Sequence, residues 1–356
     1  MAWAGLDYSK TQVDAAGRLL ASPEPDPFEL SNALAVLNNW RSAHSFPLNT
    51  FQMGLRGRAQ SVYEHALVAQ RLKRTPSIVL KLQRFPTMNL SRMQDIGGCR
   101  AVVATSRQVV ALQQRYVRSG LKHQLVNQKN YLDDPQESGY RGVHLIYKYE
   151  SDRSPTYNGR LIEMQLRSRL QHAWATAVET VGTFLQQSLK SSQGSADWLR
   201  FFALASSAFA VYERTAHVPG TPTKRSELID ELTALGKAID VRRRLRTYGT
   251  ALNVAQDAGG KEAHYFLLSL QPVEGKLAVR TFRRNELTQA TDAYLTEEKV
   301  SAEMVGSEVV LVSVDSLESL RRAYPNYFLD TEVFFRALQR ITGRTFGVPA
   351  RRAGSG

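Results

Sequence analysis

Four short segments combine the residue types that transfer of a phosphate-containing group needs. They read RLKRTPSIVLKL at 71–82, DIGGCR at 95–100, GYRGVH at 139–144 and EMQLRS at 163–168. Such transfer is catalysed mainly by positioning and electrostatics, with Mg²⁺ and side-chain cations offsetting the phosphate charge. Asp95 and Glu163 are the carboxylates placed to hold that metal. The segments therefore predict a Mg²⁺-dependent site for a polyphosphate.

The positive charge of the chain is concentrated around these segments. The chain has 46 Lys and Arg against 33 Asp and Glu, a net charge of +13. Residues 50–130 carry fourteen basic residues and only two acids, Glu64 and Asp95, so nearly the whole excess lies in under a quarter of the chain. A polyanion such as a nucleoside triphosphate or a nucleic acid is the expected partner. The alternative is a solvated basic face with no specific ligand.

Several of these residues also have a purely structural interpretation. Asp95 or Arg100 alone could form a structural ion pair, and Tyr140 alone could belong to the core. Glu163 is harder to explain in that way, because it interrupts an apolar strand on the polar side. Cys99 is interpreted as a small core residue.

The composition limits the class of protein. A chain of 356 residues with 43% hydrophobic and 22% charged residues has ordinary globular composition and the length of about two domains. No window approaches the roughly 18 apolar residues of a membrane helix, so we expect a soluble, cytoplasmic protein without membrane contact. A single cysteine excludes an internal disulfide and is too few for a zinc finger.

The first half of the chain predicts helices alternating with strands. Apolar spacing predicts amphipathic helices at 28–43 and 58–74, and Thr75-Pro76 ends one helix and starts another with Ser77 in its first turn. Residues 99–105 read as a buried strand, followed by a helix at 106–119. The amino end of the helix after Pro76 is a place where an anion can bind.

Two further strands bring polar residues to one face. Strand 140–149 places Tyr140 and His144 together, and strand 160–167 places Glu163, Gln165 and Arg167 opposite an apolar set. Long helices at 168–190 and 196–214 follow. The alternation predicts an α/β domain that ends near residue 216.

A second, smaller domain is expected towards the end of the chain. A Pro/Gly/Thr break at 217–223 precedes a helix at 226–247, and strands are predicted at 263–270, 276–282 and 308–314, with helices near 286–299 and 330–342. The predicted organisation is a first domain at 1–216, a linker and helix at 217–260, a second domain at 261–345 and a tail at 346–356.

The four segments, in this order, resemble the active-site motifs of RelA/SpoT-type pyrophosphokinases, over about residues 50–190. The resemblance implies an α/β (α+β) nucleotidyltransferase-like fold with a mixed sheet and flanking helices, and transfer of pyrophosphate from ATP. It implies that Asp95 binds Mg²⁺ and that Glu163 binds Mg²⁺ and acts as base. It assigns ATP binding to Arg71, Lys73, Ser77, Lys81 and Arg100, with Arg107 as a weaker candidate.

The resemblance also suggests an acceptor side. Tyr140 matches a tyrosine that stacks on the acceptor base, and His144 and Gln165 would line the same side. His172 lies where small synthetases often carry Asn and long ones His, which leaves the acceptor base undetermined. Ordinary members modify GDP or GTP to make (p)ppGpp, whereas a toxic subgroup modifies the 3′ CCA end of tRNA. The basic segment favours tRNA.

The end of the chain resembles the antitoxin part of fused toxin–antitoxin proteins of the CapRel type, a zinc-finger-like α+β domain that here lacks cysteines and therefore zinc. Tyr324 and Tyr327 match a Tyr-x-x-Tyr motif that covers the ATP site in those proteins. The alternative is that both tyrosines pack a small core. The resemblance implies an autoinhibited tRNA pyrophosphokinase toxin opened by a phage protein such as a major capsid protein. The other hypotheses are a (p)ppGpp synthetase and an inactive RNA-binding module.

Overall fold

The computed structural model describes residues 3–24, 26–73, 75–188, 195–246, 248, 263–271, 276–302, 308–313 and 327–344. The chain divides into two compact units. Unit 1 comprises Met1–Asp134 and Arg141–Arg169, and unit 2 comprises Pro135–Tyr140 and Leu170–Gly356. The helices that follow residue 169 thus group with the second unit, and the domain limits at 216, 260 and 345 stay predictions.

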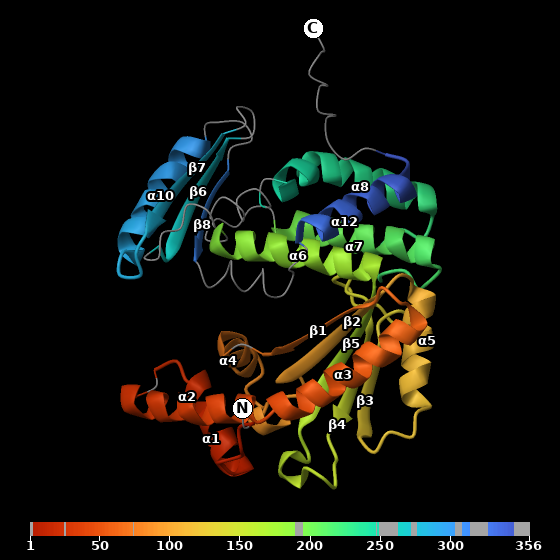
Figure 1. The fold of residues 1–356 in the computed structure, drawn as a ribbon. Helices are drawn as coiled ribbons and strands as arrows, with labels where there is room; N and C mark the ends of the chain where they lie inside the picture. The colour runs from red at the N-terminus through yellow and green to blue at the C-terminus, as the bar shows by residue number, and fades with distance from the viewer. Residues whose placement is uncertain are drawn as a thin grey trace. The chain divides into compact units, whose positions relative to one another are not determined.

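Unit 1 is built on a five-stranded mixed sheet (Figure 1). Its order is β1 (Leu67–Leu72), β2 (Gly97–Val103), β5 (Leu161–Ser168), β4 (Val143–Lys148) and β3 (Gln124–Asn130). Only β2 and β5 run parallel, while the other neighbours are antiparallel. The expected mixed sheet is therefore confirmed.

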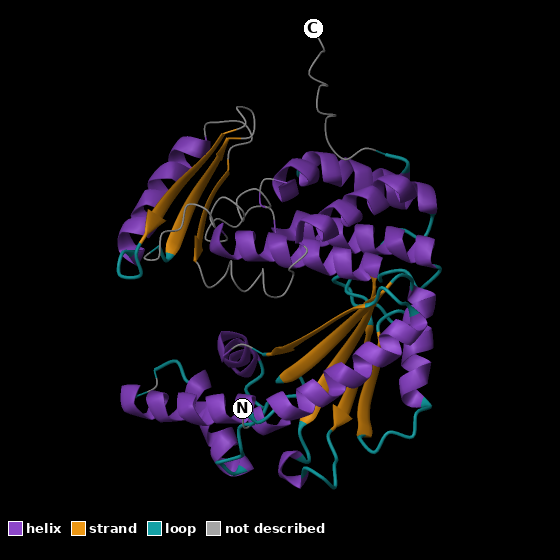
Figure 2. Ribbon diagram, in the orientation of Figure 1, coloured by secondary structure: helices purple, strands orange, loops and turns teal. Residues whose placement is uncertain are grey.

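One face of this sheet is apolar and is covered by two helices, α3 (Ser45–Val62) and α5 (Ser106–Val117) (Figure 2). Ile162, Met164 and Leu166 point from β5 into this layer and are fully buried. Because side chains alternate along a strand, the residues between them lie on the opposite face. The alternation predicted for 160–167 is confirmed.

A second cluster joins the amino-terminal helices to the beginning of the sheet. Helices α1 (Lys10–Ala21) and α2 (Pro27–Ser42) pack with α4 (Thr75–Arg84) and the short 3₁₀ helix η1 (Leu90–Arg92). Leu37, Trp40, Ile78 and Ile96 are among its buried side chains. Helix α2 is therefore anchored to the segment that carries the predicted phosphate-binding cations. A further 3₁₀ turn, η2 (Pro155–Tyr157), lies between β4 and β5.

Unit 2 contains a small sheet between helices. Its order is β7 (Lys276–Phe282), β6 (Tyr265–Gln271) and β8 (Glu308–Ser313), all antiparallel. Helix α10 (Leu287–Ala302) packs on one side through Tyr294. Phe266, Leu268 and Phe334 share a larger cluster with helices α6 (Arg169–Ser188), α7 (Ser195–Glu213), α8 (Arg225–Ala238) and α12 (Tyr327–Thr342).

Three sequence predictions need correction. The helix expected at 58–74 is wrong, because α3 ends at Val62 and the following residues pair with β2 as β1. The strand expected at 140–149 begins only at Val143. The helix expected at 226–247 is interrupted after Ala238, where Asp240 adopts φ 47°, and helical residues resume at 241. Helix α1 and strand β3 had no sequence prediction.

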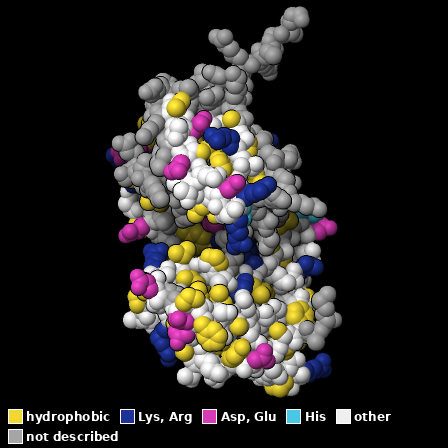
Figure 3. Space-filling view, turned by 90° about the vertical axis from the view of Figure 1, so that its left-hand side faces the viewer, with side chains coloured by type: hydrophobic (Ala, Val, Ile, Leu, Met, Phe, Trp, Pro, Cys, Tyr) yellow, Lys and Arg dark blue, Asp and Glu magenta, His cyan; other side chains and the backbone are white. Residues whose placement is uncertain are grey.

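Hydrophobic side chains also reach the surface. Phe28, Leu80 and Phe85 are exposed, and the face in Figure 3 carries hydrophobic side chains interspersed with acidic and basic ones. Among the described helices, none is both long enough and apolar enough to cross a bilayer.

Candidate active site

The second face of the five-stranded sheet, here called the polar face, carries the central residues of the site. Its members are Arg71, Gly98, Arg100, His144, Glu163 and Gln165. The strand pairing sets them side by side, since Gly98 lies opposite both Arg71 and Glu163, and Gln165 lies opposite both Arg100 and His144. Directly opposed residues in neighbouring strands point to the same side of a sheet. All four predicted segments therefore contribute a residue to one surface.

Gly98 leaves this face open between Arg71 and Glu163. A Cβ added there would have its nearest neighbours, both backbone carbonyl oxygens, at 3.8 and 4.0 Å. Gly97 points to the opposite face, where an added Cβ would lie 2.8 Å from Cδ1 of Ile162. Gly98 therefore leaves room above the polar face, whereas Gly97 allows α3 to pack closely on the sheet.

Asp95 lies just before β2 and binds two lysines. Nζ of Lys73 lies 2.8 Å from Oδ2, and Nζ of Lys81 lies 2.9 Å from Oδ1. Burial would raise the pKa of Asp95, but the two ammonium groups outweigh it and hold the pKa below its ordinary value. The structural ion pair that was one interpretation of Asp95 is thus present, and it gathers three predicted site residues at one point.

Glu163 is held by two neighbours on the polar face. Its Oε1 lies 2.9 Å from Nδ1 of His144, and its Oε2 accepts a hydrogen bond of 2.7 Å from Nε2 of Gln165. Burial would raise the pKa of Glu163, and the charge of Asp95 acts in the same direction. The hydrogen bonds from His144 and Gln165, together with the electrostatic attraction of His144, outweigh both effects, so the pKa lies below its ordinary value and the carboxylate is ionised at neutral pH.

Gln165 is itself oriented by a further residue on β5. Nη2 of Arg167 donates to Oε1 of Gln165 over 3.1 Å, which turns the amide group so that its Nε2 faces Glu163. The orientation of the Glu163 carboxylate is therefore set by His144 on β4 and by Gln165, itself held by Arg167, on β5.

The two carboxylates suit a Mg²⁺ ion. Their charges are close enough to interact, and Mg²⁺ is usually held by one or two carboxylates together with waters and substrate phosphates. Within the described residues there is no group of three or more His, Cys, Asp or Glu side chains that could hold a metal. Two carboxylates, Asp95 and Glu163, thus suit a Mg²⁺ ion that binds together with a nucleotide better than an ion held by the protein alone.

Arg41 supports the phosphate-binding segment from helix α2, a role that no motif in the sequence predicted. Its Nε donates to the carbonyl oxygen of Lys73 over 2.8 Å, and its Nη1 donates to Oγ1 of Thr75 over 3.3 Å. The amide of Lys73 also donates to the carbonyl oxygen of Ile96 over 2.7 Å. Lys73 is therefore fixed through its backbone on both sides while its ammonium group binds Asp95. Arg41 is separated from this segment by more than thirty residues, so no local pattern links them.

The remaining predicted ATP-binding residues divide into two groups. Arg71 is exposed on the polar face, and Ser77 lies half-buried in the first turn of α4. Arg107 lies exposed in the first turn of α5, on the helix layer that covers the opposite face. No described contact joins the Arg107 side chain to the polar face, so its predicted role has no geometric support.

The predicted acceptor residues are not all on one strand. Tyr140 lies before β4, in unit 2, where its ring packs edge-on beside Trp174 with the ring centroids 6.4 Å apart. The expectation that Tyr140 and His144 share a strand face is therefore wrong. His172 is buried in α6, also in unit 2. Tyr324 lies outside the described residues, as does the side chain of Tyr327, the first residue of α12.

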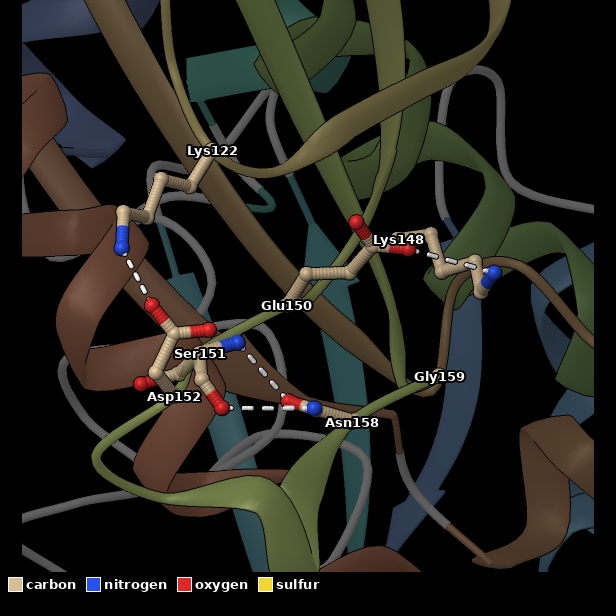
Figure 4. Close-up of a pocket in the computed structure, with 7 residues that line it drawn as sticks. All are labelled: Lys122, Lys148, Glu150, Ser151, Asp152, Asn158 and Gly159. Atoms are coloured by element: carbon tan, nitrogen blue, oxygen red, sulfur yellow. Dashed lines mark hydrogen bonds and ion pairs between the residues drawn. The ribbon is translucent and has the colours of Figure 1, made fainter.

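A separate hollow of about 440 Å³ lies near the turn between β4 and β5 (Figure 4). It is lined by Lys122, Lys148, Glu150, Ser151, Asp152, Asn158 and Gly159. Both lysines already face acids, since Lys122 binds Asp152 and Lys148 lies 3.3 Å from Glu150. This hollow contains none of the predicted site residues, and its balanced charge does not favour a polyphosphate.

Sequence comparison places these motifs among known proteins. Residues 70–182 match the family model described as a region found in RelA / SpoT proteins. The chain is 30% identical over 112 residues to GTP pyrophosphokinase YjbM of Bacillus subtilis, covering 31% of this chain and 52% of that protein. It is 31% identical over 127 residues to the uncharacterized protein Rv1366 of Mycobacterium tuberculosis, covering 35% of this chain and 42% of that one. The chain thus spans about half the length of these relatives.

Solved structures similar to this chain include small alarmone synthetase 1 of Bacillus subtilis bound to its product pppGpp. The identity is 22%, with a TM-score of 0.42, and the match covers 50% of this chain and 93% of that one. A GTP pyrophosphokinase family protein from Streptococcus pneumoniae matches at 20% identity with the same TM-score, over 49% of this chain and 90% of that one. From the family match, the chain contains a RelA/SpoT-type region that spans residues 70–182 and includes every residue of the polar face.

Proposed function

We propose that this chain is an ATP-dependent pyrophosphokinase. The observation that carries the proposal is the pair of interacting carboxylates, Asp95 and Glu163, beside Lys73 and Lys81 at one open face of a sheet. Cations and carboxylates in this arrangement suit a Mg²⁺-bound triphosphate. The name of the relative YjbM, a GTP pyrophosphokinase, supports the same reaction class.

In the proposed reaction, a hydroxyl oxygen of the acceptor attacks the β-phosphorus of ATP. A new P–O bond forms there, the bond from the β-phosphorus to the oxygen bridging it to the α-phosphorus breaks, and AMP leaves. The hydroxyl proton passes to the Glu163 carboxylate, which is ionised and oriented by His144 and Gln165. Mg²⁺ held by Asp95 and Glu163 would offset the charge of the transferred group. Lys73 and Lys81, which bind Asp95, add positive charge close to the same group.

A guanosine nucleotide is the first candidate acceptor, because the name of the relative YjbM points to GTP. The 3′ end of tRNA is the second candidate, and the observation that favours it is the basic excess of residues 50–130, which exceeds what one nucleotide needs. A catalytically inactive RNA-binding module is the remaining alternative. The ionised Glu163 argues against it, because holding a charged carboxylate in a mostly buried position beside the charge of Asp95 costs free energy, and such carboxylates cluster at catalytic sites.

The test is a transfer assay with ATP labelled at the γ-phosphate, offered with GDP, GTP or deacylated tRNA. We expect labelled acceptor together with stoichiometric AMP. Glu163→Gln should lower the rate by roughly a thousandfold, since loss of a general base and a metal ligand removes several kcal/mol of transition-state stabilisation. The matched control is Glu64→Gln, which neutralises an exposed acid outside the site. Transfer that survives in Glu163→Gln at the wild-type rate would contradict the assignment.

We further propose that residues 261–345 restrain the activity of the chain through Tyr324 and Tyr327, and that a phage protein such as a major capsid protein relieves the restraint. Support comes from the resemblance of the Tyr-x-x-Tyr segment alone. A trigger of this kind must bind the open form of the enzyme preferentially. If the proposal holds, Tyr324→Ala should be toxic in growing cells, and the double variant Tyr324→Ala/Glu163→Gln should not. Growth of the single variant at the wild-type rate, with the enzyme active in vitro, would count against the restraint.

A further inference from the structure

The basic segment that the sequence presents as one block is divided between the two sides of the five-stranded sheet. Arg71, Lys73, Lys81 and Arg100 belong to the polar face or its border. A second set lies on the helices that cover the opposite side. We call this second set the α3/α5 basic surface; its members are Arg56, Arg58, Arg107, Arg115 and Arg118.

These arginines are presented to solvent by a rigid support. Arg56, Arg107, Arg115 and Arg118 are exposed, and Arg58 is half-buried. Nη1 of Arg115 donates to Oγ of Ser61 on α3 over 2.6 Å, and the guanidinium of Arg58 lies 5.0 Å from the ring centroid of Tyr116 on α5. Both contacts bridge the two helices. Arg58 and Arg115 are therefore held in place across the two helices, while Arg56, Arg107 and Arg118 extend from the same packed helices into solvent.

The α3/α5 basic surface has no acidic counterpart on its own helices. Neither Ser45–Val62 nor Ser106–Val117 contains an Asp or Glu. Among the described residues, none of the five arginines forms an ion pair with a carboxylate. The face in Figure 3, by comparison, carries both acidic and basic side chains. Like charges gathered without compensation cost folding free energy, which suggests that an external anion uses them.

The dimensions identify the kind of anion. From Arg107 to Arg118, α5 extends over roughly 16 Å, at about 1.5 Å per residue. A nucleotide triphosphate is too short to follow that length, whereas double-stranded nucleic acid carries about nine backbone charges over it. We propose that the α3/α5 basic surface binds an RNA backbone, on the side of the sheet opposite to the polar face. The inference does not depend on the proposed pyrophosphokinase activity, because binding can be measured without ATP.

The test compares two triple variants with the same charge change in the full chain. Arg107→Gln/Arg115→Gln/Arg118→Gln alters the surface, and Arg18→Gln/Arg153→Gln/Arg284→Gln alters exposed arginines elsewhere. Binding of fluorescent bulk tRNA is measured by anisotropy between 50 and 200 mM salt, without ATP. We expect the first variant to bind tRNA about 10- to 100-fold more weakly. The slope of the logarithm of the binding constant against the logarithm of the salt concentration, here called the salt slope, should become shallower by about two to three, because each lost phosphate contact reduces it by close to one. The control variant should stay within about threefold of wild type.

Three results would overturn the proposal. The first is an equal loss in both variants, which would mean that only net charge matters. The second is unchanged binding in the surface variant. The third is arginine-dependent binding of poly-glutamate with no binding of tRNA, which would assign the surface to an acidic protein. Thermal unfolding of each variant shows whether the chain is folded. If the triple variant unfolds early, Arg118→Gln alone should still lower the salt slope by about one unit.

Discussion

The two faces of the five-stranded sheet use the same strands for opposite purposes. Ile162, Met164 and Leu166 are fully buried against α3 and α5. Glu163 and Gln165, which alternate with them along β5, are partly exposed and are joined by a hydrogen bond. On β2, Cys99 is buried in the core and its neighbours Gly98 and Arg100 lie on the polar face. A single residue step therefore separates a position that stabilises the fold from one that could contact substrate.

The comparison teaches that the polar face depends on the apolar one. Every residue of the polar face on β2 and β5 takes its position from a neighbour that is locked in the core, so the carboxylate of Glu163 is presented by a rigid element. The lysines around Asp95 are different, because Lys73 lies in the turn between β1 and α4 and Lys81 lies on α4, and this segment needs support from α2. The following experiments separate these contributions.

Among the substitutions that compare the two faces, Gly98→Val should have the largest effect on catalysis. A side chain at this position would occupy the open space between Arg71 and Glu163, where the nearest atoms to a Cβ lie at 3.8 Å or more. We expect kcat/KM to fall about a hundredfold, equivalent to about 2.7 kcal/mol, while the thermal midpoint stays close to wild type. Steady-state kinetics and thermal unfolding of the same preparation measure both quantities.

Gly97→Ala is the matched control for the opposite face. Its Cβ would lie 2.8 Å from Cδ1 of the fully buried Ile162, so the core must shift. We expect a loss of about 1–3 kcal/mol in the free energy of unfolding, with nearly unchanged kcat/KM for the folded fraction. The comparison of faces would fail if Gly98→Val unfolded the protein and Gly97→Ala abolished catalysis.

These glycines also show where prediction from the sequence succeeds and where it ends. The alternation of β5 predicted correctly that Glu163 and Gln165 face away from Ile162 and Met164, because strand periodicity is a local property. The helix expected at 58–74 failed, since Ala66, Ala69 and Leu72 also fit a helical period and only pairing with β2 decides for a strand. Periodicity carries no information about a partner strand.

For the candidate site, too, local motifs could be predicted from the sequence and contacts between distant segments could not. Asp95, Lys73 and Lys81 were predicted as site residues and do meet, because the motifs that contain them are short and ordered. Arg41 was not predicted to support the site, since its hydrogen bonds depend on tertiary packing. Tyr140 was assigned to the wrong element because the sequence does not show that the strand begins only after Gly142.

Arg41→Ala should weaken ATP binding more than it slows catalysis. The substitution removes the donors to the carbonyl oxygen of Lys73 and to Thr75, and so loosens the segment that carries the lysines. We expect KM for ATP to rise about tenfold, equivalent to about 1.4 kcal/mol, with kcat and the acceptor KM within about twofold of wild type. Arg41→Lys, which keeps one donor, should recover part of the loss.

The control for Arg41 is Arg18→Ala, which removes an exposed arginine from the neighbouring helix α1. It should leave both KM values unchanged. A general loss of stability would lower the apparent kcat through the unfolded fraction without a selective rise in KM for ATP, and that outcome would contradict a positioning role for Arg41.

The acid sensitivity of folding should depend on Asp95. Its pKa in the folded chain lies below the ordinary value, because Lys73 and Lys81 outweigh the effect of burial, so the unfolded chain binds more protons near pH 4. The stabilisation is complete above the unfolded pKa and is lost as the pH falls through the folded pKa. Each unit of lowering contributes about 1.4 kcal/mol. Urea unfolding between pH 3 and 7 should give a shallower pH dependence for Asp95→Asn than for wild type or Glu64→Gln, and equal slopes would contradict this.

Cys99 provides the smallest and most local test of the difference between the faces. Its thiol is 2% exposed, and burial raises its pKa far above the ordinary value, so almost no thiolate forms in the folded chain. We expect iodoacetamide at pH 8 to modify the native protein at least a hundredfold more slowly than the urea-unfolded chain. In Cys99→Ala/Arg100→Cys the thiol moves by one residue to the polar face, where it should react at a rate near that of an exposed cysteine. Similar slow reaction at both positions would mean that the polar face is closed to small molecules, and the open site inferred at Gly98 would then be wrong.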